Sequence, residues 1–414
     1  MKKKDKNNPD VIRCSSTTLG FSNTGKINNL DLFIEEYKKV VSITVDYLWD
    51  LKKISSLLPK EVTDTISSST WLSKRAIQCA CKQASGIVRG TRSKQKKRLA
   101  MIKTLNKEGK FKQARKLQKK YDKTKTTKPE IKKVCPELDE RFVDMDFNNP
   151  TIFDGWIILT SLGKKIKLVL PFKKTEHFNK MLAEGKIKKG IRISHDRITF
   201  NFLMTKPIPR TEGKTLGIDI GSIDVCAISD NSHTQFKKDK HGHTLENIQK
   251  SLARKKKGSK AFARSQKHRT NYIKWYLNQI NFDGIKKIRI ENIKNLRKGK
   301  RTSRFLSAWT YPLIRDGLVN KASRLGVQVD KICPTYTSQR CSKCGWTRKS
   351  NRKGKKFICT SCGFACDADH NASLNISLDL PEISKEERLL HKNKTGFYWN
   401  VVWQEPIVPA VQKV

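Results

Sequence analysis

The sequence predicts a multidomain α+β protein, and three observations carry that prediction. Apolar side chains recur at helical spacing after residue 24, and from residue 151 the apolar period changes to two. Beyond residue 211, strands alternate with helices, and two Cys-x-x-Cys pairs interrupt the alternation. We predict a β-barrel from residues 1–24 and 126–210, a helical insertion at 25–125, an α/β domain from 211–332 and 367–380, and a zinc ribbon at 333–366, with residues 381–414 unassigned.

The charge of the chain indicates its class of partner. There are 87 lysine and arginine residues against 38 aspartate and glutamate residues, a formal net charge of +49. A compact fold with this charge repels itself unless a polyanion neutralises much of it, and nucleic acid is the obvious polyanion. No apolar stretch approaches the roughly 20 residues that span a bilayer, and the basic start leads into no apolar signal core. We therefore expect a soluble, intracellular protein that binds nucleic acid.

The helical insertion is predicted to contain three amphipathic helices, over residues 28–54, 68–94 and 96–123. On the second helix, Gln78, Lys82 and Gln83 could reach DNA bases, because glutamine can bond adenine and lysine can contact guanine. The same three side chains could equally be solvated positions on a basic helix.

Two predicted strand pairs follow, at residues 151–172 and 190–207, with turn-like centres SLGKK and SHDR. Ile198, Phe200, Phe202 and Met204 alternate with other residues, which indicates a small antiparallel sheet or barrel. A first strand near residues 11–20 could complete it. For the α/β domain we expect a buried hairpin from residue 215, a basic helical stretch at 245–280, a strand at 286–292, a helix at 304–326, a strand at 327–336 and a last helix from about 370.

Four of the eleven cysteines have the spacing of a metal site. Cys341, Cys344, Cys359 and Cys362 form C-x2-C-x14-C-x2-C, with a glycine after each pair. Two such knuckles close a tetrahedral site around one Zn²⁺, and four thiolates leave no open position, so the zinc should be structural. Cys333 and Cys366 lie nearby but have no paired partner. Paired and scattered cysteines in one chain indicate a reducing compartment rather than a disulfide scaffold.

Acidic residues follow strands in a pattern of their own. In TLGIDIG the apolar residues occupy one strand phase and Asp219 the other, and its flanking glycines would let a phosphate backbone approach. Glu291 ends the strand KKIRIEN, and Asp367 and Asp369 stand at the start of the last helix. Acids gathered at one point repel each other unless divalent cations bind between them, which is the design of a two-Mg²⁺ phosphodiesterase. Taken singly, Asp219 could be a polar strand position, Glu291 a strand end and Asp369 a helix N-cap.

These residues resemble the TnpB nucleases and the related Fanzor proteins and miniature type V CRISPR effectors. The matching stretches are GIDIG, LARKKKGSKAFARSQKHRTNYIKW, IRIEN, PTYTSQRCSKCG, FICTSCG and DADHNASLNI, in the family's order. The resemblance implies a split RNase H-like (RuvC) nuclease domain with Asp219, Glu291 and Asp369 as catalytic acids. Asp369 is preferred to Asp367 because the family's acid stands two residues before Asn-Ala. Ser373 departs from the usual alanine, and the N-terminal half matches only in layout, a wedge-type barrel with a helical recognition region.

The resemblance further implies an RNA-guided, Mg²⁺-dependent DNA endonuclease. A structured guide RNA would bind the basic N-terminal regions, and the protein would read a short flanking motif while base pairing selects double-stranded target DNA. One active site would cut both strands. We expect a monomer rather than a dimer, in the cytoplasm of a prokaryote and on the nucleoid when it acts.

Four other interpretations remain open. A miniature type V CRISPR effector has the same architecture, and gene neighbourhood rather than sequence separates it from TnpB. A non-enzymatic zinc-ribbon RNA-binding protein explains charge and cysteines but leaves the ordered acids unexplained. A cut-and-paste transposase usually has its acids in the order Asp, Asp, Glu, whereas here the order is Asp, Glu, Asp. A nuclease-dead RNA-guided repressor is disfavoured because all three acids are intact.

Overall fold

The computed structural model describes residues 10–55, 58–148, 151–293, 310–384, 387–388 and 396–400, without the side chains of residues 235 and 236. They belong to two compact units, Met1–Thr205 and Lys206–Val414. Within the described ranges, no helix is both long enough and apolar enough to cross a membrane.

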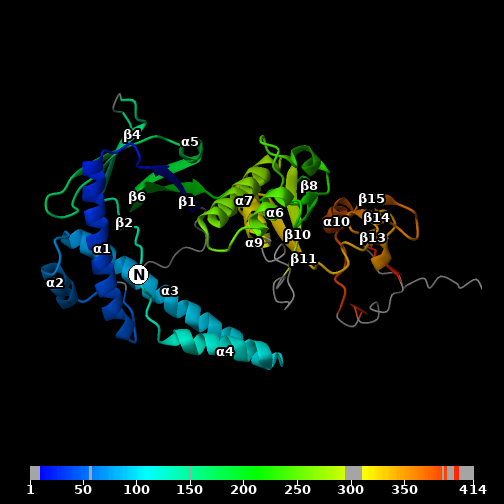
Figure 1. The fold of residues 1–414 in the computed structure, drawn as a ribbon, viewed down its shortest axis with the longest axis horizontal. Coiled ribbons are helices and arrows are strands. Elements are labelled where there is room, and N and C mark those ends of the chain that lie inside the picture. The colour runs from blue at the N-terminus through cyan, green and yellow to red at the C-terminus, as the bar shows by residue number, and fades with distance from the viewer. Residues whose placement is uncertain are drawn as a thin grey trace, which may run out of the picture. The chain divides into compact units, whose positions relative to one another are not determined.

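The first unit contains two antiparallel sheets (Figure 1). In the four-stranded sheet, β1 (Asp10–Thr18) pairs along its whole length with β7 (Arg197–Thr205). Next come β6 (Gly185–Ser194) and, at the far edge, β2 (Glu137–Leu138). The second sheet joins β3 (Val143–Asp146), β4 (Gly155–Leu159) and β5 (Leu168–Phe172). The strand near residues 11–20 therefore does complete the later strand pair, as the sequence predicts.

The core between these sheets is aromatic, and the described strands form two ladders rather than one closed barrel. Phe178 comes from α5 (Glu176–Glu184), a short helix that the sequence does not predict. Its ring lies 5.9 Å from Phe172 in the second sheet, and 5.0 and 5.2 Å from Phe200 and Phe202 in the first. The Phe178 ring therefore packs against aromatic rings of both sheets. The predicted alternation in β7 is confirmed, because Ile198, Phe200, Phe202 and Met204 are all buried.

Four helices lie between β1 and β2 in the chain: α1 (Thr24–Asp50), α2 (Lys60–Ser68), α3 (Lys74–Lys107) and α4 (Phe111–Lys125). The predicted break near residue 95 is wrong, because α3 runs straight through it. No glycine or proline occurs between residues 91 and 107, so nothing there stops the helix. The break falls instead at Gly109, whose φ of 67° suits glycine.

The second unit is organised by a four-stranded sheet in the order β11-β10-β8-β9 (Figure 1). The predicted hairpin is β8 (Lys214–Asp219) with β9 (Ala227–Ile228), and β10 (Ile285–Glu291) and β11 (Gln328–Ile332) run parallel to β8. A 3₁₀ turn follows at Ser232–Phe236. The basic helical stretch is two helices, α6 (Leu245–Ala253) and α7 (Lys260–Gln279), because Gly258 takes a φ of 90° between them.

Two helices complete this α/β layer, α9 (Tyr311–Arg324) and α10 (Ala368–Ser377). The first part of the predicted helix at 304–326 lies outside the described residues. Between α9 and α10 comes the small cysteine-bearing lobe, with β12 (Trp346–Thr347), η2 (Lys349–Asn351), β13 (Arg352–Lys353), β14 (Lys356–Ile358) and β15 (Ala365–Asp367). Near the C-terminus, β16 (Phe397–Tyr398) pairs with β12.

Candidate active site and zinc centre

Three carboxylates line one cleft of about 540 Å³ in the second unit. Asp219 ends β8 and Glu291 ends β10. These two strands are parallel neighbours, so their carboxyl ends, where α/β sheets bind ligands, lie at the same edge. Asp369 joins them from the first turn of α10. The structure thus brings together the three acids that the sequence singles out.

Gly217, two residues before Asp219, is required for packing. A Cβ on Gly217 would lie 2.0 Å from the Ser373 carbonyl oxygen and 2.4 Å from the Ser377 nitrogen, both in α10. On the other side, a Cβ on Gly221 would lie 2.6 Å from the Asp224 carbonyl oxygen, within the β8–β9 hairpin. Packing therefore requires both glycines, and the approach of a phosphate backbone to Asp219 stays a prediction. The glycines let α10 and the hairpin approach β8, and this approach sets where Asp369 stands.

The two aspartates at the start of α10 have different roles. Asp367 is the N-cap, and its Oδ1 accepts hydrogen bonds from the Asp369 and His370 backbone nitrogens, each at 3.0 Å. The alternative that Asp369 is merely a cap is therefore wrong. Its carboxylate lines the cleft instead.

Two basic residues of the cysteine-bearing lobe reach into the cleft. Arg352 Nη2 lies 2.7 Å from Asp369 Oδ1, and Lys355 contacts the other oxygen, Oδ2. Lys355 also lies 3.0 Å from Asp224 Oδ2. The hairpin of β13 and β14 therefore rests on the carboxylate edge. Sequence reasoning missed both residues, because the run NRKGKK looks like solvated charge and only the hairpin's fold brings it to the acids.

Burial and mutual repulsion shape the electrostatics of the cleft. Burial raises the pKa of Asp219 well above its usual range, and the charges of Glu291 and Asp369 raise it further. Burial also raises the pKa of Glu291, although a hydrogen bond from the Thr337 hydroxyl opposes this. Burial by itself would lower the pKa of Lys355, but its bonds to Asp369 and Asp224 raise it. The site has more negative charge than its surroundings balance, which suits cation binding.

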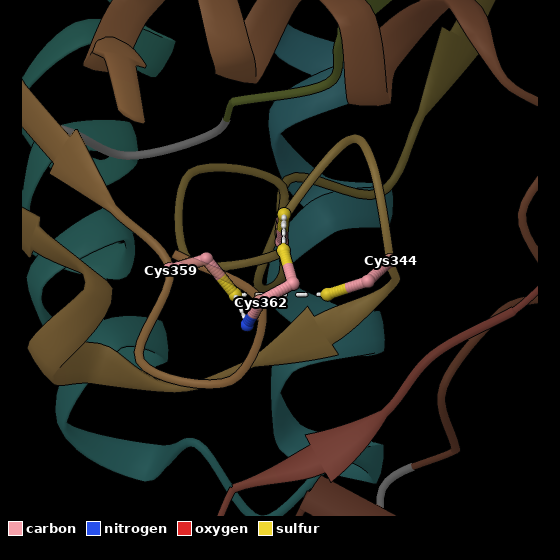
Figure 2. Close-up of side chains that lie close together, drawn as sticks. Cys344, Cys359 and Cys362 are labelled. Atoms are coloured by element: carbon pink, nitrogen blue, oxygen red, sulfur yellow. Dashed lines mark hydrogen bonds between the residues drawn. The ribbon is translucent and has the colours of Figure 1, made fainter. Parts of the chain in front are cut away.

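Four cysteines form a compact cluster (Figure 2). The sulfurs of Cys341, Cys344, Cys359 and Cys362 all lie within 4.8 Å of one another, and Figure 2 shows three of these side chains, those of Cys344, Cys359 and Cys362. The Cys341–Cys362 and Cys344–Cys359 sulfur distances are 3.7 and 3.6 Å. Tetrahedral Zn–S bonds of about 2.3 Å place the sulfurs about 3.8 Å apart, so the geometry fits one Zn²⁺. A backbone N–H at Phe364 lowers the pKa of Cys362 to about 7, whereas burial raises the pKa of Cys341 and Cys344, so a bound metal would have to stabilise their thiolates.

The cysteine cluster and the acid cleft differ in compactness. Among the described residues, only the four cysteines bring three or more ligand atoms within 4.8 Å of one another. The three carboxylates share the cleft but are spread more widely. Oxygen ligands of this kind are nevertheless the donors that Mg²⁺ prefers.

The three polar residues of α3 line a separate cavity of about 740 Å³ in the first unit. Gln78 and Lys82 are exposed at its wall, together with Arg141 and Arg192. Gln83 has a structural partner, because its Nε2 donates to the Cys135 carbonyl oxygen at 3.1 Å. Among the described residues, no hydrogen bond engages the side chain of Gln78 or Lys82, whereas one of the two N–H groups of the Gln83 amide is already bonded.

Parts of the chain are similar in sequence to known proteins. Residues 312–376 match the family described as Cas12f1-like, TNB domain. The CRISPR-associated endodeoxyribonuclease Cas12f1 of Sulfoacidibacillus thermotolerans is 39% identical over 28% of this chain and 26% of its own length. A TnpB-like protein of Methanocaldococcus jannaschii is 25% identical over 64% of this chain and 92% of its own. The alignments with three Cas12f1 proteins span 19% to 26% of those proteins.

Two solved structures are also similar in part. A Cas12f1 complex with guide RNA and target DNA has a TM-score of 0.38 and 14% identity, over 90% of this chain and 99% of that one. The mini-RNA-guided endonuclease CRISPR-Cas phi3 has a TM-score of 0.46 and 12% identity, over 89% and 92%.

The fold and site define a mixed α/β protein with a carboxylate cleft and a four-cysteine lobe. Residues 312–376 match the Cas12f1-like TNB family, and over parts of its length the chain is similar to TnpB-like proteins and to Cas12f1 endodeoxyribonucleases.

Proposed function

We propose that the protein is an RNA-guided, Mg²⁺-dependent DNA endonuclease of the TnpB type. The observation that carries this proposal is the cleft in which Asp219, Glu291 and Asp369 meet beside a four-cysteine lobe. The names of the sequence relatives support it, since they include a CRISPR-associated endodeoxyribonuclease and TnpB-like proteins. The two antiparallel sheets of the first unit are proposed as a wedge-type domain and the helices α1–α4 as its recognition insertion.

The three acids are the residues that would hold the catalytic Mg²⁺, in keeping with their oxygen donors and with the raised pKa of Asp219. Bound there, two such ions would activate water and stabilise the leaving oxygen of a phosphodiester. Arg352 and Lys355 now neutralise Asp369, and both would become available to a DNA phosphate when a cation replaces them. The four-cysteine lobe would thus contribute directly to substrate binding at the cleft.

Two surfaces of the first unit support nucleic-acid partners. The cavity wall that carries Gln78 and Lys82 combines hydrogen-bonding side chains with the positive charge of Arg141 and Arg192. We propose it as the surface that reads a flanking motif in DNA, because such side chains recognise base edges.

The second is an aromatic-lysine surface around β4, composed of Phe21, Phe147, Phe153, Trp156, Lys26, Lys173 and Lys174. Phe153 lies 5.8 Å from Phe21 and 5.5 Å from Trp156, measured between ring centroids. Each lysine lies over one of the rings, at 5.1 to 5.7 Å. Phe21 is 42% exposed. One exposed ring and its half-buried neighbours, flanked by lysines, suit unpaired bases and their phosphates, so we propose that part of the guide RNA stacks here.

Two neighbouring interpretations lead to different experiments. A miniature type V CRISPR effector would share every feature above, and the flanking DNA separates the two, through transposon ends or a repeat array. A non-enzymatic zinc-ribbon RNA-binding protein would bind RNA without cutting DNA, so metal-dependent cleavage separates that one.

The test is to express the protein with its native flanking DNA and sequence the RNA that remains bound after purification at moderate salt. Cleavage of matched DNA is then assayed in Mg²⁺ before and after RNase treatment. Asp219→Ala should abolish cutting and leave RNA-guided binding intact, while Asp283→Ala, an exposed aspartate outside the cleft, should behave like the parent. Recovery of only random RNA, or directed cleavage that survives removal of all RNA, would reject the guided mechanism. Cleavage by Asp219→Ala at the parent rate would reject the cleft.

A further inference from the structure

Arg340, the residue before the first zinc cysteine, is a buried arginine. It is only 5% exposed. Its Nε donates to the Trp399 carbonyl oxygen at 2.5 Å, and its Nη1 donates to the Cys341 carbonyl oxygen at 3.1 Å and to Asn375 Oδ1 at 2.8 Å. All three acceptors are uncharged, so none of them balances the charge of this guanidinium.

The four-cysteine cluster supplies a reason to bury that charge. Four thiolates around one Zn²⁺ carry a net charge of about −2, and burying such a charge is costly unless a cation lies near it. Cys341 is fully buried and follows Arg340 directly in the chain. The arginine is thus placed to balance part of the charge of a zinc-loaded knuckle.

A C-terminal strap, residues 396–400, lies on the same knuckle. Its strand β16 pairs with β12, and the Trp399 backbone nitrogen donates to the Gly345 carbonyl oxygen at 3.0 Å. The Tyr398 ring lies 4.9 Å from the Trp346 ring, between centroids. Arg340 holds the other side of the strap through the Trp399 carbonyl oxygen. The sequence leaves this segment unassigned, and here it completes the lobe.

From Arg340 a chain of buried hydrogen bonds leads to the cleft. Asn375 in α10 accepts from Arg340 and donates from Nδ2 to the Thr337 carbonyl oxygen at 2.9 Å and to the Arg340 carbonyl oxygen at 2.7 Å. The Thr337 hydroxyl donates to Glu291 Oε1. Asn375 and Thr337 are buried, as is Glu291 at 9% exposure, so water competes little for these bonds.

We propose that Arg340 is a positioning residue that couples the zinc knuckle and the C-terminal strap to the Glu291 carboxylate. Its guanidinium fixes Asn375, Asn375 fixes the Thr337 backbone, and the Thr337 hydroxyl orients Glu291 for a cation. Loss of the zinc ion, of the C-terminal strap or of the Arg340 side chain then weakens cation binding in the cleft, although none of them lies in the cleft. The inference rests on the proposed function only in taking the cleft as a cation site.

The test measures two metals separately, on the full chain. Zinc retention is followed as the rate of Zn²⁺ loss to a chelator, and cation binding in the cleft is followed by electron paramagnetic resonance of Mn²⁺, counting only the binding that Asp219→Asn removes. Partners that orient metal ligands are typically worth about 10- to 100-fold in metal affinity. Arg340→Met should accelerate zinc loss and weaken cleft Mn²⁺ binding by about 10-fold or more. Arg348→Met, the same change at an exposed arginine of the lobe, should do neither.

Thr337→Val isolates the last link of the chain. It should weaken Mn²⁺ binding while zinc loss stays at the parent rate. The double variant of Thr337→Val and Arg340→Met should bind Mn²⁺ no more weakly than whichever single variant binds it more weakly, because the two residues act through one path. A chain ending at residue 395 should resemble Arg340→Met, and one ending at residue 400 should resemble the parent.

Unchanged Mn²⁺ binding in Arg340→Met, or independent and additive effects in the double variant, would overturn the coupling. A parent protein without Asp219-dependent Mn²⁺ binding would instead overturn the cleft assignment on which the coupling rests.

Discussion

Gly217→Ala tests whether the contact between β8 and α10 sets the geometry of the acid cleft. The added Cβ would lie 2.0 Å from the Ser373 carbonyl oxygen, whereas ordinary contact begins at about 3.4 Å. Strand or helix must therefore move by about 1.4 Å. Asp219 lies two residues further along β8, and Asp369 lies four residues before Ser373 on α10. The substitution should displace Asp219 and Asp369, the proposed catalytic acids, relative to each other without removing either.

Two magnitudes follow from that displacement. Overpacking of a buried contact costs about 1 to 3 kcal/mol, and a misplacement of about 1 Å at a catalytic site lowers the rate by about 100-fold. We expect cleavage of matched DNA to fall at least that far while guide RNA remains bound. The assay pairs single-turnover cleavage in Mg²⁺ with thermal unfolding of the same preparation.

Gly86→Ala is the matched control, because Gly86 lies inside α3 and a Cβ there would meet nothing within 4 Å. Replacing an exposed helical glycine by alanine should stabilise the protein by about 0.5 to 1 kcal/mol and leave cleavage unchanged. The two variants therefore predict opposite shifts in Tm from the same chemical change. Parent-like cleavage and Tm in Gly217→Ala would refute the argument that α10 positions Asp369 through this glycine.

Three shorter predictions concern zinc, pH and RNA. Purified protein reconstituted under reducing conditions should contain one Zn²⁺ per chain, and Cys344→Ser should loosen the lobe without unfolding the first unit; elemental analysis well below one per chain would contradict the cysteine site. Because the folded state raises the pKa of Asp219 from the ordinary 3.8, the metal-free folded protein retains a proton that the unfolded chain releases. The stability of the metal-free protein should therefore fall as pH rises from about 4. Mg²⁺ should offset this loss, and Asp219→Asn should make the stability less dependent on pH. The same dependence of Tm on pH in the metal-free parent, the parent with Mg²⁺ and Asp219→Asn would argue against this. Phe21→Ala should weaken single-stranded RNA binding by about 1 to 3 kcal/mol with an unchanged salt slope, and Phe111→Ala, at a 67% exposed phenylalanine on α4, should not; equal effects in filter binding would remove the aromatic-lysine surface.

The sequence predicts the features that depend on local pattern. The alternation in β7, the β8–β9 hairpin and the spacing of the four cysteines all involve residues close together in the chain, and the structure has each of them. The helix break between α3 and α4 is a local feature too, but the sequence analysis placed it near residue 95 instead of at Gly109. Gly90 stays within α3, and only Gly109 takes a positive φ.

Contacts between segments that are far apart in the chain cannot be predicted from local sequence patterns. From the sequence, Gly217 indicates only that a phosphate backbone could approach Asp219. The position of α10 shows that helix packing requires this glycine. Arg352 and Lys355 look like solvated charge until the β13–β14 hairpin brings them to Asp369. The C-terminal strap has a two-residue strand, too short to show any period.

The choice between Asp367 and Asp369 depends on where a helix begins, to within one residue. An N-cap side chain turns back to bond the first backbone N–H groups, so it is oriented toward the end of the helix. Asp367 holds that position, with two backbone hydrogen bonds at 3.0 Å. Asp369 is thereby left free of the cap, on the first turn and at the cleft. Had α10 begun two residues later, Asp369 would be the cap and the cleft would have two acids rather than three. Sequence reasoning locates helix ends only to within a few residues, so the resemblance had to select Asp369, and the hydrogen bonds of Asp367 supply the physical reason.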